Sequence, residues 1–385
     1  MDAPAEKALG LCCQVGTFYY DPWALLKLRL VSREIKNHAD VALGDELSSG
    51  HWFSSFRGPP KMLTETNLGA MYEGLRRFCA SLGVAPARFI LSHTMIVDCS
   101  ARNGTAVIAP PLSFLAQLCT IGVRIALTVR VVGRRDGICS SWQSETVSLN
   151  KVVPLPSLFE IHVSGRDAAT KTALLWLLSC SASSAPPCLE VVTFMGYTLT
   201  EQSAAALMGL LAGQPRLKSL SLPQNTLSGL TLKELPTLTT LIQLDLSANY
   251  LNRSAELFAA ALAPLPQIQR LNLSSNGLCG HLRTIASSFP PALTSLDLSA
   301  NELGYDRSAL GELLMQQTAL TTLNLSYNHL RNKGTHGLPL SRLTALTLLD
   351  LTANEISPNW APVGVPWLVR HCDDVGGKGK GFYLL

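Results

Sequence analysis

One pattern recurs through the second half of this 385-residue chain and limits what the chain can fold into. From Leu241 to Leu251 the sequence has leucine at the first, fourth, sixth and eleventh places and asparagine at the ninth. A period of this kind predicts an array of similar units rather than two or three independent domains. The frame recurs at steps of 24 to 27 residues, with its asparagine at Asn225, Asn249, Asn276, Asn301, Asn328 and Asn354.

The positions of leucine and asparagine in the repeat have a physical reason. Side chains alternate between the two faces of a strand, so Leu244 and Leu246 point to the same side. A single repeat cannot bury its leucines alone, whereas stacked repeats share one continuous core. The asparagine follows the strand, where its amide is able to satisfy backbone groups of a neighbouring turn. The six asparagines are therefore expected to form a structural ladder, with the strands lining one concave face.

The segments between the strands show helical spacing of apolar residues over 203–211, 254–263 and 308–316. In the second of these the predicted buried stripe is Leu257, Phe258, Ala261 and Leu262, whereas the return over 226–235 is predicted to be irregular. In motif and period the region resembles the leucine-rich-repeat family, in its ribonuclease-inhibitor-like subtype. The resemblance implies an α/β solenoid with a curved parallel sheet inside and short helices outside.

The presence or absence of this repeat frame divides the chain into segments. Leucine-rich repeats are predicted over 158–356, the first two of them atypical. Residues 57–157 are either degenerate early repeats or a separate small α/β domain, with a helix over 64–82 and strands over 88–97 and 123–131. Residues 357–385 leave the frame and are predicted to cap the last leucine layer, ahead of a flexible tail.

Composition excludes several classes of protein. Apolar residues make up 47% of the chain and charged residues 15%, which excludes disorder over most of its length. No run of about 18 uncharged apolar residues occurs, so no membrane-spanning helix is expected. A net charge of +4 is too small for a nucleic-acid coat. The ten cysteines include no Cys-x-x-Cys pair, and the first residues resemble no signal peptide. We therefore expect reduced thiols and a cytoplasmic location, with nuclear and organellar locations as alternatives.

Residues 21–35 predict a short apolar helix that begins with Asp21 as N-cap and Pro22 at its first position. The run Asp-Pro-x-x-Leu-Leu-x-Leu-Arg-Leu-Val-Ser-Arg resembles the second half of an F-box, so residues 1–56 are predicted to be a small helical module. The alternative is a helix that only caps the first repeat. The resemblance implies binding to the Skp-type adaptor of a cullin ubiquitin ligase through Leu25, Leu26, Leu28, Leu30, Val31, Ser32 and Arg33.

No sequence signature of an enzyme occurs in a suitable context. The eight histidines are scattered, and His371 beside Cys372 lacks a second group at metal-ligand spacing. We therefore expect no catalytic residue, no cofactor and no metal site.

The outward positions of the strands follow from the same frame and are mostly small and polar. The face lacks the basic stripe of a nucleic-acid binder, whereas its acidic row suits a basic peptide. A second group of candidate contacts lies upstream, at Arg124, Arg130, Arg134, Arg135 and Arg166. The predicted partner-binding residues of the concave face are Gln243, Asp245, Arg270, Asn272, Asp297, Asn324, Tyr327 and Asp350.

These features together predict a non-catalytic scaffold for protein–protein interaction. Given the F-box resemblance, the preferred function is a substrate adaptor in which the N-terminal module binds a Skp-type adaptor and cullin while the solenoid holds a client. The alternative is an architectural subunit of a large multi-subunit assembly such as a ribonucleoprotein particle or an axoneme.

Overall fold

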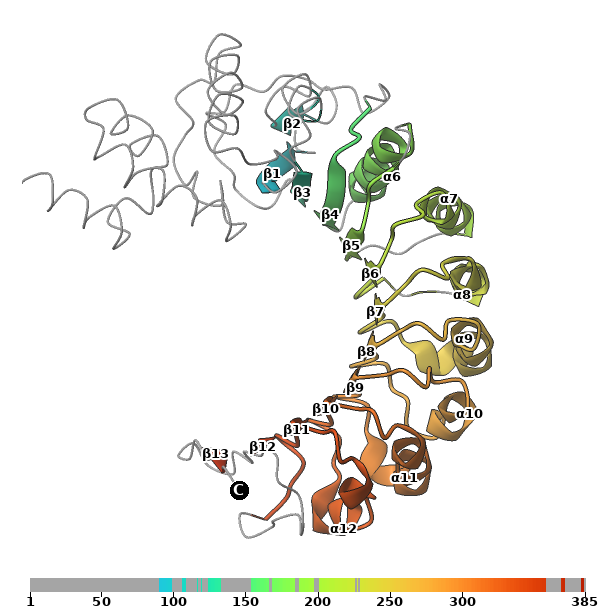
Figure 1. Ribbon diagram of the computed structural model, residues 1–385, viewed down its shortest axis with the longest axis vertical. Coiled ribbons are helices and arrows are strands. Elements are labelled where there is room, and N and C mark those ends of the chain that lie inside the picture. The colour runs from blue at the N-terminus through green and yellow to red at the C-terminus, as the bar shows by residue number, and fades with distance from the viewer. Residues whose placement is uncertain are drawn as a thin grey trace, which may run out of the picture. The chain divides into compact units, whose positions relative to one another are not determined.

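Figure 1 shows a computed structural model of the chain. The chain divides into two compact units, one of residues 1–162 with 183–188 and one of 163–182 with 189–385. The predicted N-terminal module over 1–56 and the predicted helix over 64–82 lie outside the described residues. The structure describes residues 90–98, 106–108, 116, 119, 124–132, 154–165, 168–183, 187–196, 201–225, 227, 229–357, 368–370 and 382–383.

The first unit contains a small mixed sheet. Strand β1 (Ile90–Asp98) pairs in parallel with β3 (Arg124–Val132) and antiparallel with β2 (Ala106–Ile108), which confirms the two strands predicted over 88–97 and 123–131. Period-two alternation in β3 buries Ile125 and Leu127 completely. Most of strand β4 (Leu158–Ser164) also belongs to this unit.

The second unit is built from short strands that pair in parallel in chain order (Figure 1). The register advances from repeat to repeat without a slip, so that Leu244 pairs with Leu271, which in turn pairs with Leu296. The strands are β5 (Val191–Met195), β6 (Ser219–Ser221), β7 (Gln243–Asp245), β8 (Arg270–Asn272), β9 (Ser295–Asp297), β10 (Thr322–Asn324), β11 (Leu348–Asp350) and β12 (Leu368–Arg370).

The leucines of the repeat form the core of this unit. The middle leucine of each strand from β6 to β11, such as Leu244 or Leu323, is at most 2% exposed, and its two neighbours in the strand point outward. All the helices of the unit lie on the other side of the open, curved sheet (Figure 1). Its architecture is therefore that of a leucine-rich-repeat solenoid, as predicted.

The returning segments are helical where the apolar spacing predicted helices. Helices α6 (Ala168–Ala182), α7 (Glu201–Ala212), α9 (Ala255–Leu262) and α11 (Arg307–Gln316) follow the strands β4, β5, β7 and β9. The other returns are shorter: α8 (Gly229–Glu234), α10 (Leu282–Ala286) and α12 (Arg331–His336), together with 3-10 turns at Leu235–Thr237, Leu251–Ser254, Leu303–Tyr305 and Leu340–Arg342.

Two local predictions about these returns are wrong. The segment 226–235 contains the helix α8, because burial of Leu232 and Leu235 outweighs the weak helix propensity of its glycine and threonines. In α9, Leu257 is 41% exposed. The buried stripe is centred on Phe258 and Leu262, and a helix turns about 100° per residue, so Leu257 lies off that stripe.

Threonine hydroxyls link successive strands where they begin. Thr347 Oγ1 donates to the carbonyl oxygen of Thr321 at 2.9 Å, and Thr321 Oγ1 donates to that of Thr294 at 2.9 Å. Thr294 Oγ1 in turn donates to the carbonyl oxygen of Gln269 at 3.2 Å. This second ladder was not predicted from the sequence, since threonine is also an ordinary strand residue.

The C-terminal segment continues the sheet in its described part. Strand β12 pairs in parallel with β11, and β13 (Phe382–Tyr383) pairs antiparallel with β12. The cap residues predicted between 357 and 367 lie outside the described residues, apart from Ser357. Within the described ranges, no helix combines the length and the apolar content that a membrane crossing requires.

Candidate interaction surface

The asparagine of each repeat is buried just beyond the end of its strand. The six ladder asparagines are exposed by 1% or less. The amide oxygen of Asn301 accepts the backbone N–H groups of Asn276 at 2.9 Å and of Leu278 at 3.3 Å. Equivalent pairs of bonds end on Asn249, Asn276, Asn328 and Asn354. One amide oxygen therefore satisfies two buried donors of the preceding repeat.

The amide nitrogen completes the connection. Asn301 Nδ2 donates to the carbonyl oxygens of Leu273, in the preceding repeat, at 2.9 Å and of Leu298, in its own repeat, at 3.0 Å. Asn249 and Asn354 make the same kind of bond, to Leu222 and Leu325, at 2.7 and 2.8 Å. Leaving a buried polar group unsatisfied costs about 1–3 kcal/mol, so the ladder fixes how neighbouring repeats stack.

For the ladder asparagines from Asn249 to Asn354, the residues on either side adopt left-handed backbone conformations. Around Asn301, Ala300 has φ 54° and Glu302 has φ 58°. Such a conformation costs a non-glycine residue about 1–2 kcal/mol, and the ladder bonds offset this cost. The loop that leaves each strand is therefore held in one shape, and the side chain that follows the asparagine has a fixed place at the edge of the solenoid.

The row of outward residues that end the short strands also has a structural role. This row, which we call the concave row, consists of Ser221, Asp245, Asn272, Asp297, Asn324 and Asp350, paired in register. From Asp245 to Asp350, each Oδ1 atom accepts the backbone N–H of the residue two positions later, at 2.9–3.0 Å. These bonds fix the direction of each side chain and leave it partly exposed.

Further bonds join the outward residues of neighbouring strands. Ser221 Oγ donates to Asp245 Oδ2 at 3.0 Å, and Asn324 Nδ2 donates to Asp297 Oδ2 at 2.9 Å. In the row before, Arg270 Nε donates to Gln243 Oε1 at 3.1 Å. The structure thus brings seven of the eight predicted concave residues together on adjacent strands, from β7 to β11.

The eighth residue, Tyr327, lies beyond the strand and belongs to a set of exposed tyrosines. Tyr250, Tyr305 and Tyr327 are 54%, 73% and 61% exposed. Tyr250 and Tyr327 lie on the loops that leave β7 and β10, and Tyr305 ends the 3-10 turn Leu303–Tyr305. The guanidinium carbon of Arg253 lies 5.2 Å from the ring centroid of Tyr250. Tyrosine is enriched among residues that dominate binding energy, so this edge adds to the candidate surface.

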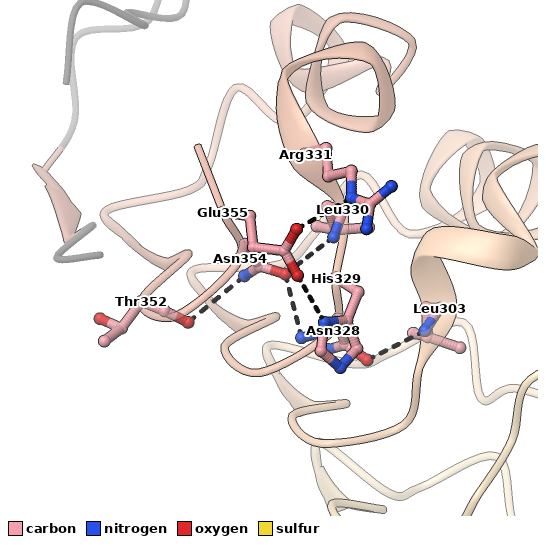
Figure 2. Close-up of polar contacts among 8 residues, drawn as sticks. All are labelled: Leu303, Asn328, His329, Leu330, Arg331, Thr352, Asn354 and Glu355. Atoms are coloured by element: carbon pink, nitrogen blue, oxygen red, sulfur yellow. Dashed lines mark hydrogen bonds and ion pairs between the residues drawn. The ribbon is translucent and has the colours of Figure 1, made fainter. Parts of the chain in front are cut away.

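A group of three charged or polar side chains occupies the same edge near the end of the array (Figure 2). Glu355 Oε1 lies 2.9 Å from His329 Nδ1, and Glu355 Oε2 accepts a bond from Arg331 Nε at 2.9 Å. These hydrogen bonds, first that with His329 and then that with Arg331, lower the pKa of the Glu355 carboxyl. All three side chains are at least half exposed, so solvent screens the group.

Tyr327 was predicted from the sequence, but the other edge residues were missed because the prediction relied mainly on the outward strand positions. For Tyr250, His329 and Glu355 the signal is the position directly after the ladder asparagine, where a left-handed backbone conformation presents the side chain at the edge. When that column is read in the repeat frame, it gives Tyr250, Gly277, Glu302, His329 and Glu355.

The other predicted contacts are only partly described. The adaptor-binding residues between Leu25 and Arg33 lie outside the described residues. Among the five upstream arginines, only Arg124 has a described side chain, and its guanidinium carbon lies 4.0 Å from the ring centroid of Phe159. This arginine therefore packs against a core residue of the first unit.

In the described part of the chain, no three His, Cys, Asp or Glu side chains are close enough to share a metal ion. Two of its thiols are made less reactive by their surroundings. Burial raises the pKa of the Cys119 thiol. The pKa of the Cys279 thiol is raised by burial first and then by the carboxylates of Asp306 and Glu302. A thiol is the weaker nucleophile when its pKa is raised, because less of it is ionised.

Comparison with known proteins gives partial matches. No profile of a known protein family matches the chain. Podocan-like protein 1 of Homo sapiens is 36% identical over 118 residues, which are 30% of this chain and 21% of that protein. Podocan-like protein 1 of Mus musculus is 32% identical over 141 residues, 37% of this chain and 24% of that protein. The matches thus span about a fifth to a quarter of the length of these relatives.

Solved structures show similar backbones at low identity. The leucine-rich repeat-containing protein LegL7 from Legionella pneumophila is 20% identical with a TM-score of 0.43, over 68% of this chain and 82% of that chain. TLR13, solved in a complex with ssRNA13, is 20% identical with a TM-score of 0.34, over 60% of this chain and 32% of that chain. The strand register and asparagine ladder of the chain itself define its solenoid.

Proposed function

We propose that this chain is a non-catalytic scaffold that binds a protein partner on the outward face of its curved sheet. One observation carries the proposal. The outward side chains of β6 to β11 are held in register by the backbone and by side-chain bonds, and no described segment covers them (Figure 1). A rigid surface of partly exposed polar groups loses little conformational freedom on binding.

A more specific proposal concerns the subtype of the repeats and the proteins that the scaffold binds besides its client. We assign the repeats to the ribonuclease-inhibitor-like subtype, because their steps of 24 to 27 residues alternate strands with helices such as α7, α9 and α11. The F-box resemblance of residues 21–33 supports a substrate adaptor, in which Leu28 and Val31 contact a Skp-type adaptor and the solenoid presents a client to a cullin ligase.

The binding face is tested by placing the same new charge on each side of the solenoid. Thr322→Arg adds a guanidinium to the sheet face of β10, and Met315→Arg adds one to α11, where Met315 is already 55% exposed. We expect the full chain to lose its captured partner with Thr322→Arg and to keep it with Met315→Arg. Equal capture by both variants, each folded by circular dichroism, would reject the sheet face as the binding surface.

The adaptor function is tested separately by affinity capture from the source cells. We expect the wild-type chain to recover a Skp-type adaptor and a cullin, and the double variant Leu28→Asp with Val31→Asp to lose both while keeping the client. Recovery of a stable large particle without those subunits would instead support an architectural subunit.

A further inference from the structure

The sheet face of the solenoid has a regular charge pattern as well as an open surface. Within the concave row the acidic residues are Asp245, Asp297 and Asp350, which lie on β7, β9 and β11. Asn272 and Asn324 separate them on the intervening strands. Because the register is uniform, the three carboxylates stand at the same height on alternate strands.

Sheet geometry fixes the spacing of these carboxylates. Neighbouring strands are about 4.8 Å apart, so alternate strands are about 9.6 Å apart along the row. Side chains on the inner side of a curved sheet converge, which shortens this spacing toward a bound partner. A polyproline II segment advances about 3.1 Å per residue, so every third side chain recurs on one side after about 9.3 Å. The two periods match.

The charge balance of the face favours a cationic partner. In the row before the concave row the one cation between β6 and β11 is Arg270, which is bonded to Gln243. Lys218, outside these rows, lies 3.7 Å from Glu190. The acidic stretch ends at β12, where Arg370 pairs in register with Asp350. Three carboxylates with their directions fixed by backbone N–H groups therefore face the open side.

The surroundings of the row suit an extended chain. The row after it, just beyond the ends of these strands, has only small side chains from Ser247 to Thr352, so a peptide backbone is able to approach the sheet. Tyr327 stands at the end of β10 and is 61% exposed, which provides an aromatic surface for a proline ring. Phosphate groups of a nucleic acid would be repelled by the same carboxylates.

We propose that the sheet face binds an extended protein segment in the polyproline II conformation, with Lys or Arg at every third residue. The segment crosses the strands from β7 to β11 and places successive cations at Asp245, Asp297 and Asp350. This inference rests on the proposed function, because it names the class of partner that the sheet face accepts.

The test uses the full chain and two labelled synthetic peptides of the same composition, followed by fluorescence anisotropy near physiological salt. One peptide has four Lys-Pro-Pro triplets, and the other has its four lysines in one block followed by the prolines. We expect the triplet peptide to bind about tenfold more tightly or better, the gain from several weak ion pairs acting together.

The triple variant Asp245→Asn with Asp297→Asn and Asp350→Asn removes the three negative charges of the concave row and is expected to keep the fold. Asn272 and Asn324 already make the same bond to a backbone N–H two residues later, so the substituted asparagines keep that bond. We expect this variant to bind both peptides equally weakly. The matched control Glu234→Gln with Glu256→Gln and Glu312→Gln removes three carboxylates on the helices α8, α9 and α11, outside the sheet face, and it should retain the preference.

Two outcomes would overturn the inference: equal binding of the two peptides by the wild-type chain, or the same loss of binding in both triple variants. The proposed function fails separately. If Thr322→Arg still abolishes partner capture while the triplet peptide shows no preference, the sheet face remains the binding surface and its partner is of another class.

Discussion

Each repeat of the solenoid contains two polar positions a few residues apart, and the structure treats them differently. Asn301 lies beyond the end of β9, has no exposed surface and bonds to backbone groups of two repeats. Asp297, at the end of the same strand, is partly exposed and bonds mainly to Ser299 and Asn324. The first position joins repeats, whereas the second orients a side chain at the surface.

The difference separates what fixes the fold from what is available for recognition. Removing a ladder asparagine leaves buried donors and acceptors that water cannot reach. Removing a residue of the concave row exposes groups that water is able to satisfy. The free energy of unfolding should therefore depend strongly on the first set, and partner binding on the second. The substitutions below test this separation.

Asn301→Ala should cause the largest loss of stability. It removes the acceptor for two buried N–H groups and the donor to three carbonyls, so we expect a loss of about 3 kcal/mol or more. The measurement is the urea midpoint by circular dichroism. The matched control is Asn272→Ala, which removes the acceptor for Ser274 N–H in a partly exposed site and should cost about 1 kcal/mol or less. Equal losses would abolish the distinction between the two positions.

Gly304→Ala tests how closely the strand-exit loops of neighbouring repeats pack. A Cβ atom at Gly304 would lie 1.9 Å from the carbonyl oxygen of His329, so the backbone must move. We expect a loss of about 2 kcal/mol or more in thermal or urea unfolding. Gly209→Ala provides the control, because a Cβ atom there meets nothing within 4 Å and its position is inside helix α7. That change should stabilise the chain by about 0.5–1 kcal/mol. Loss of stability in both variants would point to a general intolerance of alanine.

Gln317→Leu tests whether every buried polar residue stabilises the fold. Gln317 is 2% exposed and its Oε1 atom has no hydrogen-bond partner, whereas the same place in two other repeats is occupied by Leu265 and Leu343. We expect the free energy of unfolding, measured by urea denaturation, to rise by about 1 kcal/mol. Gln214→Leu should gain less, because Gln214 Oε1 accepts a bond from Ser181 at 3.2 Å. A destabilised Gln317→Leu would show that this amide is satisfied after all.

The smallest effect concerns the exposed edge, where Glu355 faces His329 and Arg331. The folded pKa of Glu355 lies below its unfolded value, so its contribution to stability is present above the ordinary carboxyl range. That contribution is lost as the pH falls through the lowered pKa. Carboxyl-carbon NMR should show the low pKa, and Glu355→Gln should remove a small part of the acid dependence of the melting temperature. An ordinary pKa for Glu355 would contradict the arrangement in Figure 2.

The repeat frame predicted the solenoid and the strand alignment because leucine spacing and asparagine position are dictated by the buried core. It did not predict that Leu257 is exposed, because the helical returns are short and their phase depends on a single buried residue such as Phe258. It also did not predict that Asp245 and Asp297 accept backbone N–H groups. An outward aspartate occupies the same position in the repeat whether or not its carboxylate is bonded. Long-range pairs such as His329 with Glu355 become visible only when repeats are stacked.

The claim that the sheet face is the recognition surface is tested most directly by site-specific photocross-linking in the source cells. A photoreactive amino acid replaces Thr322 on the sheet face of β10 in one chain and Met315 on helix α11 in another. We expect a discrete cross-linked protein partner from position 322 and none from position 315. A partner captured from position 315 alone would contradict it.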